Sequence, residues 1–301
     1  MKLENSIILT LTYSAQFGQA LTEDSLYQRL IDVKTTPTTL NRVLNVLVLN
    51  NIVIKHKDLL TLRGYKHLIA QTHERKGETN KYWSEARNLA KLIQKIPWAV
   101  GAAVTGSVAV NNAKNNDDLD FMIITASNRM WLTRLILNLY SLAINKRKPR
   151  GQPLQPGWCF NLWLSTSQLE IPTSKRSLYT AFELIQAAWL LGSAQLLDDF
   201  WQANLWVKQY LPQAQLNRTY LIEPENQPGY QQSHKQGFVY FYLMSVLEKI
   251  VYFIQYIYMS SHRTNELVET HQAFFHPINT KKRIYFKWRK IVQVWQKKYL
   301  I

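Results

Sequence analysis

Apolar residues recur at helical spacing through the first fifty residues of the chain. Residues 5–15 and 39–49 each place apolar side chains on one face, and Thr22 precedes another such segment as a candidate N-terminal cap. Two short apolar runs follow, at residues 52–55 and 59–62, around a polar turn. The pattern therefore predicts three helices followed by a β-hairpin.

The next stretch predicts two separate helices. One covers residues 64–75 as a linker and stops at residues 76–78, which include a glycine. The other covers residues 79–96, where one face is apolar and the opposite face carries Lys and Arg. Pro97 then ends the helical pattern.

The centre of the chain alternates between strands and helices. Apolar runs predict strands at residues 98–104, 118–125 and 158–164. Helices are expected over residues 107–114 and 130–144, and the second is expected to bury Leu132, Leu135, Ile136, Leu139 and Leu142. A basic loop at residues 146–150 lies between the second of these helices and the strand at 158–164.

The last third of the chain is expected to be helical, with helices over residues 177–191, 196–210, 238–259 and 281–299 and a loop at 217–230. The run at 238–259 is long enough to span a bilayer, but Glu248 and Lys249 lie at its centre. We therefore expect a helix buried against the central region, while binding to a membrane surface stays open. The last helix mixes basic and aromatic residues, which suits either nucleic-acid contact or packing on the core.

These elements predict three domains in an α/β (α+β) protein. Residues 1–75 form a small N-terminal domain, 76–172 a central core and 173–301 a C-terminal helical domain. The length of 301 residues exceeds one average domain, and the 47% apolar content supports buried cores.

The charge narrows the range of partners. The formal net charge is +16, which favours polyanions such as nucleic acid, nucleotide phosphates or an anionic membrane surface. Cys159 is the single cysteine, so the chain has neither an intrachain disulfide nor a zinc site built from several cysteines. We expect a cytoplasmic protein.

Candidate chemistry is concentrated between Thr105 and Asp120. Gly106 and Ser107 form a small-residue turn after an apolar strand, and such a turn offers backbone N–H groups and a hydroxyl to a phosphate. Asp118 and Asp120 point to one face if they lie on a strand. Two adjacent carboxylates repel each other unless a cation lies between them, and Mg²⁺ or Mn²⁺ prefers such oxygen ligands.

This stretch resembles the signature of the polymerase-β-like nucleotidyltransferase superfamily, which is a hydrophobic residue, Gly-Ser, a spacer and Asp-hydrophobic-Asp-hydrophobic. The resemblance implies that Asp118 and Asp120 bind metal and that Thr105, Gly106 and Ser107 bind the triphosphate of an NTP. The implied reaction moves a nucleoside monophosphate onto an acceptor hydroxyl of RNA, DNA, a protein or a small molecule. The simpler alternative is a surface loop whose acids lead into a core strand.

The third strand departs from the superfamily pattern. A third carboxylate is usual there, but Asn161 is the polar residue of this strand and is the best match to that position. An amide cannot accept a proton from a nucleophile. The alternative function is therefore a catalytically impaired regulator that binds nucleotide and nucleic acid. Glu170 or Glu183 near the aspartates would favour the enzyme, although Glu183 also suits a paired acid in an apolar setting.

The N-terminal segment resembles a winged helix-turn-helix domain. That resemblance implies that Asn41 and Arg42 face a nucleic-acid groove and that Lys55 and Lys57 contact phosphate. Winged helices also serve as packing and dimerisation modules, and the predicted helix at residues 39–49 holds one basic residue. Both interpretations of this domain stay open.

Overall fold

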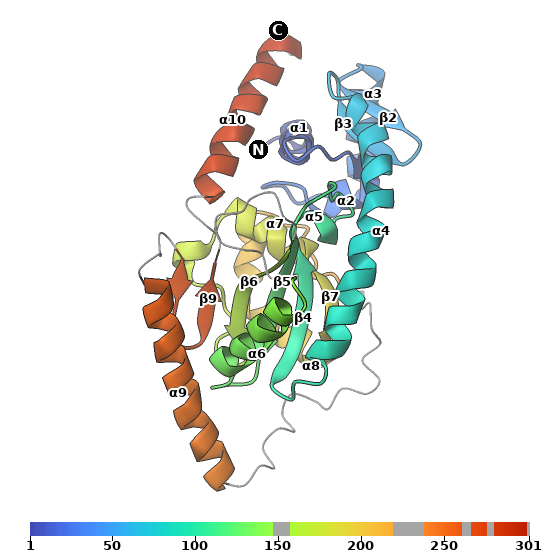
Figure 1. Cartoon of the computed structure of the whole chain (residues 1–301). Helices are drawn as coiled ribbons and strands as arrows, with labels where there is room; N and C mark the ends of the chain where they lie inside the picture. Colours follow the sequence, from blue (N-terminus) through green and yellow to red (C-terminus); the bar gives the residue numbers. More distant parts are fainter. Residues whose placement is uncertain (147–156, 219–237, 261–265, 276–279, 300–301) are drawn as a thin grey trace.

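The computed structural model describes residues 1–146, 157–218, 238–260, 266–275 and 280–299 (Figure 1). Most of the loop predicted at residues 217–230 and most of the basic loop at 146–150 lie outside these ranges. The described chain is a mixed α/β fold with two sheets. One sheet belongs to the N-terminal part, and the other forms the centre of the molecule (Figure 1).

The N-terminal unit, residues 3–62, contains the predicted three helices and hairpin. Its elements are α1 (Leu3–Ala15), β1 (Leu21–Thr22), α2 (Glu23–Gln28), α3 (Pro37–Leu49), β2 (Val53–His56) and β3 (Leu59–Leu62). Thr22 caps α2 as expected, because its side chain accepts the backbone N–H of Ser25. The three strands pair in the order β1-β3-β2, and β3 is buried throughout.

Helix α4 (His67–Ile93) is continuous where the sequence predicted two helices. It passes through Gly77, at which an added Cβ would meet no atom within 4 Å. In Figure 1 it runs from the N-terminal unit down the side of the central sheet. The predicted stop at residues 76–78 is wrong, because a helix tolerates one glycine at a cost of about 1 kcal/mol.

The central sheet has six strands in the order β7-β4-β5-β6-β9-β8. The strands are β4 (Ala99–Thr105), β5 (Leu119–Thr125), β6 (Trp158–Ser165), β7 (Ala188–Gly192), β8 (Leu267–Val268) and β9 (Gln272–Phe274). β5 and β6 are parallel, and the other neighbouring pairs are antiparallel.

Alternation of side chains places this sheet between two layers of helices. Ala103 and Met122 face a core with α7 (Leu178–Gln186) and α8 (Ala194–Ala203). Val104 and Phe121 face the opposite core with α4, α6 (Met130–Ala143) and α9 (Phe238–Ser260). Because both faces are covered, the strands read as continuous apolar runs.

The segment 173–301 is not a purely helical domain. The prediction of a helix over residues 177–191 is wrong at its end, because α7 stops at Gln186 and β7 pairs with β4. β8 and β9 also join the central sheet. Helical spacing and a buried strand are hard to distinguish in a short apolar run. The remaining short elements are α5 (Gly106–Ala109) and the 3-10 turns η1 (Thr173–Lys175) and η2 (Leu205–Gln209).

The predicted inner face of α6 is largely wrong. Leu132 is buried, but Ile136, Leu139 and Leu142 are 40%, 56% and 56% exposed. The helix instead buries Met130, Trp131, Leu137 and Ser141. Leucines occur around most of this helix, so apolar content alone does not identify its inner face.

Helix α9 packs against α6 through one face, with Val251 and Met259 buried. The expectation of a helix buried against the central region holds for this face only. Its other face exposes large apolar side chains in the described part of the chain: Tyr240, Tyr242, Leu243, Val246, Leu247, Ile250, Phe253, Ile254, Ile257 and Tyr258. Within the described ranges, no helix has both the length and the apolar content that crossing a bilayer requires.

Helix α10 (Thr280–Tyr299) fastens the end of the described chain to the N-terminal unit (Figure 1). The indole N–H of Trp288 donates to the carbonyl of Leu9 at 3.2 Å, and that of Trp295 donates to the carbonyl of Arg63 at 2.8 Å. Trp295 is 1% exposed and belongs to the core of the N-terminal unit. Residues more than two hundred positions apart therefore share one core.

Candidate functional site

The turn between β4 and α5 brings the backbone against Asp120. Thr105 is paired with Asp120 across the two antiparallel strands. Gly106 follows with φ +67°, and a Cβ there would lie 2.8 Å from Oδ2 of Asp120. A left-handed φ and this close approach both favour glycine. The predicted Gly-Ser turn and acidic strand are therefore adjacent in space.

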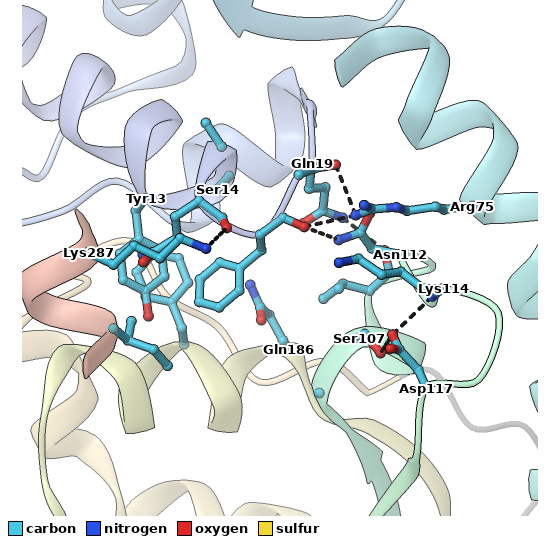
Figure 2. A pocket seen from close by; sticks show the side chains of 18 of the residues that line it. Tyr13, Ser14, Gln19, Arg75, Ser107, Asn112, Lys114, Asp117, Gln186 and Lys287 are labelled. Carbon is cyan, nitrogen blue, oxygen red and sulfur yellow. Dashed lines mark hydrogen bonds between the residues drawn. The ribbon is translucent and has the colours of Figure 1, made fainter. Parts of the chain in front are cut away.

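The hydroxyl of Ser107 has a structural partner. Its Oγ donates to Oδ2 of Asp117 at 2.8 Å, and the backbone N–H of Lys114 donates to the same oxygen at 2.9 Å (Figure 2). Asp117 thus closes the loop between α5 and β5. The helix predicted over residues 107–114 is present but shorter, since α5 ends at Ala109. A side-chain oxygen that binds nearby backbone competes with helix formation.

Asp118 and Asp120 line one cavity. Asp118 lies one residue before β5, and its Oδ1 accepts the backbone N–H of Gly157 at 3.2 Å. Asn161, on the neighbouring parallel strand β6, donates from its side-chain nitrogen to Oδ1 of Asp120. The structure therefore places Asn161 beside Asp120, whose carboxylate its amide orients.

The cavity has a volume of about 720 Å³ and lies between the N-terminal unit, the central sheet, α7 and α10. Ordinary small-molecule sites have volumes of about 300–1,000 Å³. Figure 2 shows side chains from these elements pointing toward one another around it. The acidic, basic and histidine side chains that line it are His67, Arg75, Lys114, Asp117, Asp118, Asp120, Glu183, Arg283 and Lys287.

Arg75 joins the N-terminal unit to the central region. Its Nη1 donates to the carbonyl of Phe17 at 2.9 Å and to Oδ1 of Asn112 at 3.0 Å (Figure 2). Asn112 in turn donates to the carbonyl of Phe17 at 3.0 Å. Burial lowers the pKa of the Arg75 guanidinium, although Asp117 and Glu74 oppose that shift. These bonds fix the position of the loop that forms one cavity wall.

Glu183 and Tyr179 form a pair on the α7 side of the cavity. The phenol of Tyr179 donates to Oε1 of Glu183 at 2.6 Å. Burial raises the pKa of Tyr179 well above its usual range, and the charge of Glu183 adds to the shift. Glu170 is exposed and paired with Arg176, and it is not a cavity residue. Glu183 is therefore both a paired acid and a cavity residue.

Two polar side chains of the cavity wall, both from the N-terminal unit, lack hydrogen-bond partners within the described residues. They are the phenol of Tyr13 and the side-chain amide of Gln16, on residues that are 4% and 7% exposed. Both residues line the cavity. Buried polar groups normally have partners, and leaving one unpaired costs about 1–3 kcal/mol. This wall therefore contains buried polar atoms without partners among the described residues.

Two side chains of the cavity, both carboxylates, offer the kind of oxygen ligand that a hard divalent cation prefers. The carboxylates of Asp118 and Asp120 line the same cavity, and oxygen donors of this kind suit Mg²⁺ or Mn²⁺. No group of three His, Cys, Asp or Glu side chains placed to hold a metal is found in the part of the chain that the structure describes. Asn161 does not supply the third carboxylate.

The four candidate nucleic-acid residues lie away from this cavity. Asn41 and Arg42 are exposed on α3, and Lys55 and Lys57 are exposed on the β2–β3 hairpin. Lys55 forms an ion pair with Glu23, which neutralises part of the predicted basic wing. Their contact with nucleic acid stays a prediction.

Some cavity residues were not singled out in the sequence. The pattern of strands and acids led to Gly106, Ser107, Asp118 and Asp120, which line the cavity, and to Asn161, which is hydrogen-bonded to Asp120. The roles of Tyr13, Gln16, Arg75 and Asp117 depend on long-range packing that local spacing does not encode.

Comparison of the chain with protein-family models, with curated proteins and with solved structures gave no match in any of the three.

Proposed function

We propose that the protein is a metal-dependent nucleotidyltransferase that moves a nucleoside monophosphate from an NTP to an acceptor hydroxyl. The observation that carries this proposal is the shared cavity of Gly106, Ser107, Asp118 and Asp120. Their order on strand, turn and following strand is that of the polymerase-β-like nucleotidyltransferase superfamily, which the sequence resembles.

Each group of cavity residues has a role in this proposal. Asp118 and Asp120 hold Mg²⁺ or Mn²⁺, which, when bound, neutralises phosphate charge and polarises the phosphoryl group. Backbone N–H groups at Thr105, Gly106 and Ser107 orient the triphosphate. Asn161 holds the carboxylate of Asp120 in place through its hydrogen bond.

The proposed reaction forms a bond between the acceptor oxygen and the α-phosphorus and breaks the bond to the β-phosphate oxygen. Pyrophosphate leaves with the electron pair of that bond. The proton of the acceptor hydroxyl needs a base, which the Asn161 amide cannot be. Glu183 is a carboxylate in the same cavity wall and is our candidate for this role.

Incubation of the protein with each α-³²P-labelled NTP, Mg²⁺ or Mn²⁺, total RNA and total protein tests the proposal. We expect label on a macromolecule, and its loss in the Asp118→Asn/Asp120→Asn variant. Asp58→Asn, in the exposed hairpin turn, is the control and should keep the activity. The absence of both label and metal-dependent nucleotide binding would rule out the site.

The second candidate function is a regulator that binds nucleotide and nucleic acid without transfer. The observation that favours it is Asn161 at the position where a third carboxylate is usual. In that case, isothermal titration should detect NTP binding that needs Mg²⁺ and the two aspartates. No label should then reach any acceptor in the transfer assay.

A further inference from the structure

Helix α10 is strongly basic. Its 20 residues contain no acid and carry exposed basic side chains at Lys281, Lys282, Arg283, Lys287, Arg289, Lys290, Lys297 and Lys298. None of these side chains forms an ion pair with an acid of the described residues. A row of uncompensated cations attracts a polyanion and raises its rate of association.

An aromatic pocket opens at the start of this helix. Its volume is about 330 Å³, and its walls combine five aromatic residues with two lysines: Tyr13, Tyr179, Tyr285, Phe286, Trp288, Lys281 and Lys282. Tyr285 and Phe286 are 50% and 64% exposed, so their rings are open to a partner. Aromatic faces beside cations are the usual means of binding unpaired bases and their phosphates.

The aromatic pocket adjoins the main cavity. Tyr13, Tyr179 and Ile284 line both spaces. Arg283 and Lys287 lie on the same helix and line the main cavity, where Lys287 donates to the carbonyl of Gln16 at 3.0 Å (Figure 2). One helix thus connects an outer basic row, an aromatic pocket and the wall of the candidate catalytic cavity.

We propose that single-stranded nucleic acid is the acceptor, and that it binds along α10 with an unpaired base in the aromatic pocket and its terminal hydroxyl in the main cavity. This inference rests on the proposed function, because it names the acceptor of that reaction. Backbone phosphates contact the basic row, and a base stacks on Tyr285 or Phe286. The net charge of +16 supports the same partner.

Equilibrium binding without NTP or metal tests this proposal separately from catalysis. The probe is a fluorescein-labelled single-stranded RNA of about 20 nucleotides, followed by anisotropy at several salt concentrations. We expect log K to fall linearly with log [salt], because phosphate contacts release counterions. A single-stranded DNA probe of the same sequence distinguishes RNA from DNA as the bound strand. A fully paired RNA should bind more weakly, because its bases cannot stack on the protein.

Two sets of variants locate the binding surface. Tyr285→Ala/Phe286→Ala should reduce affinity about tenfold or more, since stacking contributes about 1–3 kcal/mol per base. Lys282→Gln/Arg289→Gln/Lys290→Gln should weaken binding and reduce the salt slope by up to about 2, at about 0.7 per lost phosphate contact. The matched control, Lys34→Gln/Lys91→Gln/Lys95→Gln, removes three exposed charges elsewhere and should have a smaller effect on both.

The proposal would be overturned if the α10 charge variant and its matched control reduced RNA affinity equally, or if Tyr285→Ala/Phe286→Ala kept the parent's affinity. It would also be overturned if duplex RNA bound as tightly as single-stranded RNA. Polyphosphate, which lacks bases, should compete less well than single-stranded RNA, and equal competition would have the same consequence. Thermal midpoints close to that of the parent protein confirm that the variants are folded. The Asp118→Asn/Asp120→Asn variant should bind RNA normally. Absence of transfer by the parent protein, with its RNA binding intact, would count against the proposed function alone.

Discussion

Gly106 shows how one residue shapes the candidate site. The backbone at Gly106 has a left-handed φ of +67°, and an added Cβ would lie 2.8 Å from Oδ2 of Asp120. Gly106→Ala should therefore destabilise the fold by about 1–2 kcal/mol and displace the Asp120 carboxylate. We expect metal-dependent nucleotide binding to fall at least about tenfold, measured by titration calorimetry beside urea unfolding. Unchanged binding would show that Asp120 is not a ligand-binding residue.

Glu248 places a carboxyl group in the middle of the apolar helix α9, where it has a structural role. Its two carboxylate oxygens accept the backbone N–H groups of Trp131 and Leu132, at 2.7 and 2.9 Å, at the start of α6. A carboxylate there also interacts favourably with the helix dipole. The residue that disfavours a membrane span in the sequence thus joins α9 to α6 in the structure.

The pH dependence of stability should reveal this carboxylate. Burial raises the pKa of Glu248 above its ordinary value of 4.5, although the two N–H groups and Arg129 oppose the shift. The folded protein then holds this proton more tightly than the unfolded chain. The stabilising contribution is full below about pH 4.5 and is lost as the pH rises through the raised folded pKa.

Glu248→Gln removes this titration. The stability of the variant relative to the parent should therefore be lowest below about pH 4.5 and should improve as the pH rises toward about pH 7. Urea unfolding at a series of pH values measures the difference. The exposed Glu4→Gln control should show less of this change. If the difference in stability between Glu248→Gln and the parent did not change with pH, that result would contradict a raised pKa of Glu248.

At the scale of elements, the continuity of α4 is the clearest departure from the sequence prediction. Gly77 lies inside the helix, with open space where an added Cβ would lie. Gly77→Ala should therefore stabilise the protein by about 0.5–1 kcal/mol, because alanine has the higher helix propensity. Thermal unfolding measures the change. Destabilisation would mean that the chain turns at Gly77, as the sequence suggested.

Local patterns predicted the elements that carry the candidate site. The apolar strands β4 and β5 and the Gly106–Ser107 turn were predictable, because alternation and turn chemistry are local. The place of β7 beside β4 was not predictable, since its short, mostly apolar run suits a helix as well as a strand. The inner face of α6 depended on where α9 packs, which lies more than one hundred residues away.

At the scale of the whole molecule, α10 couples the ends of the described chain. Trp288 and Trp295 both donate to backbone carbonyls near or within the N-terminal unit. The same helix carries Arg283 and Lys287 into the main cavity. The cavity therefore exists only where the N-terminal unit, the central sheet and α10 are assembled together, so its shape depends on contacts far from the aspartates.

Trp295→Ala tests this coupling. Loss of a large side chain that is 1% exposed, together with its bond to the Arg63 carbonyl, should cost about 3–5 kcal/mol. Phe286→Ala is the matched control on the same helix, and it should change stability by less than about 0.5 kcal/mol because that ring is 64% exposed. Urea unfolding measures both variants.

If α10 is part of one cooperative structure, the transition of Trp295→Ala should shift as a single step when followed by both circular dichroism and tryptophan fluorescence. Coincident curves would mean that the N-terminal unit and the central sheet unfold together. An early step seen by one probe alone would mean that α10 and the N-terminal unit separate first. The cavity wall built from Tyr13, Gln16 and Lys287 would then be lost before the aspartates on β5 are disturbed.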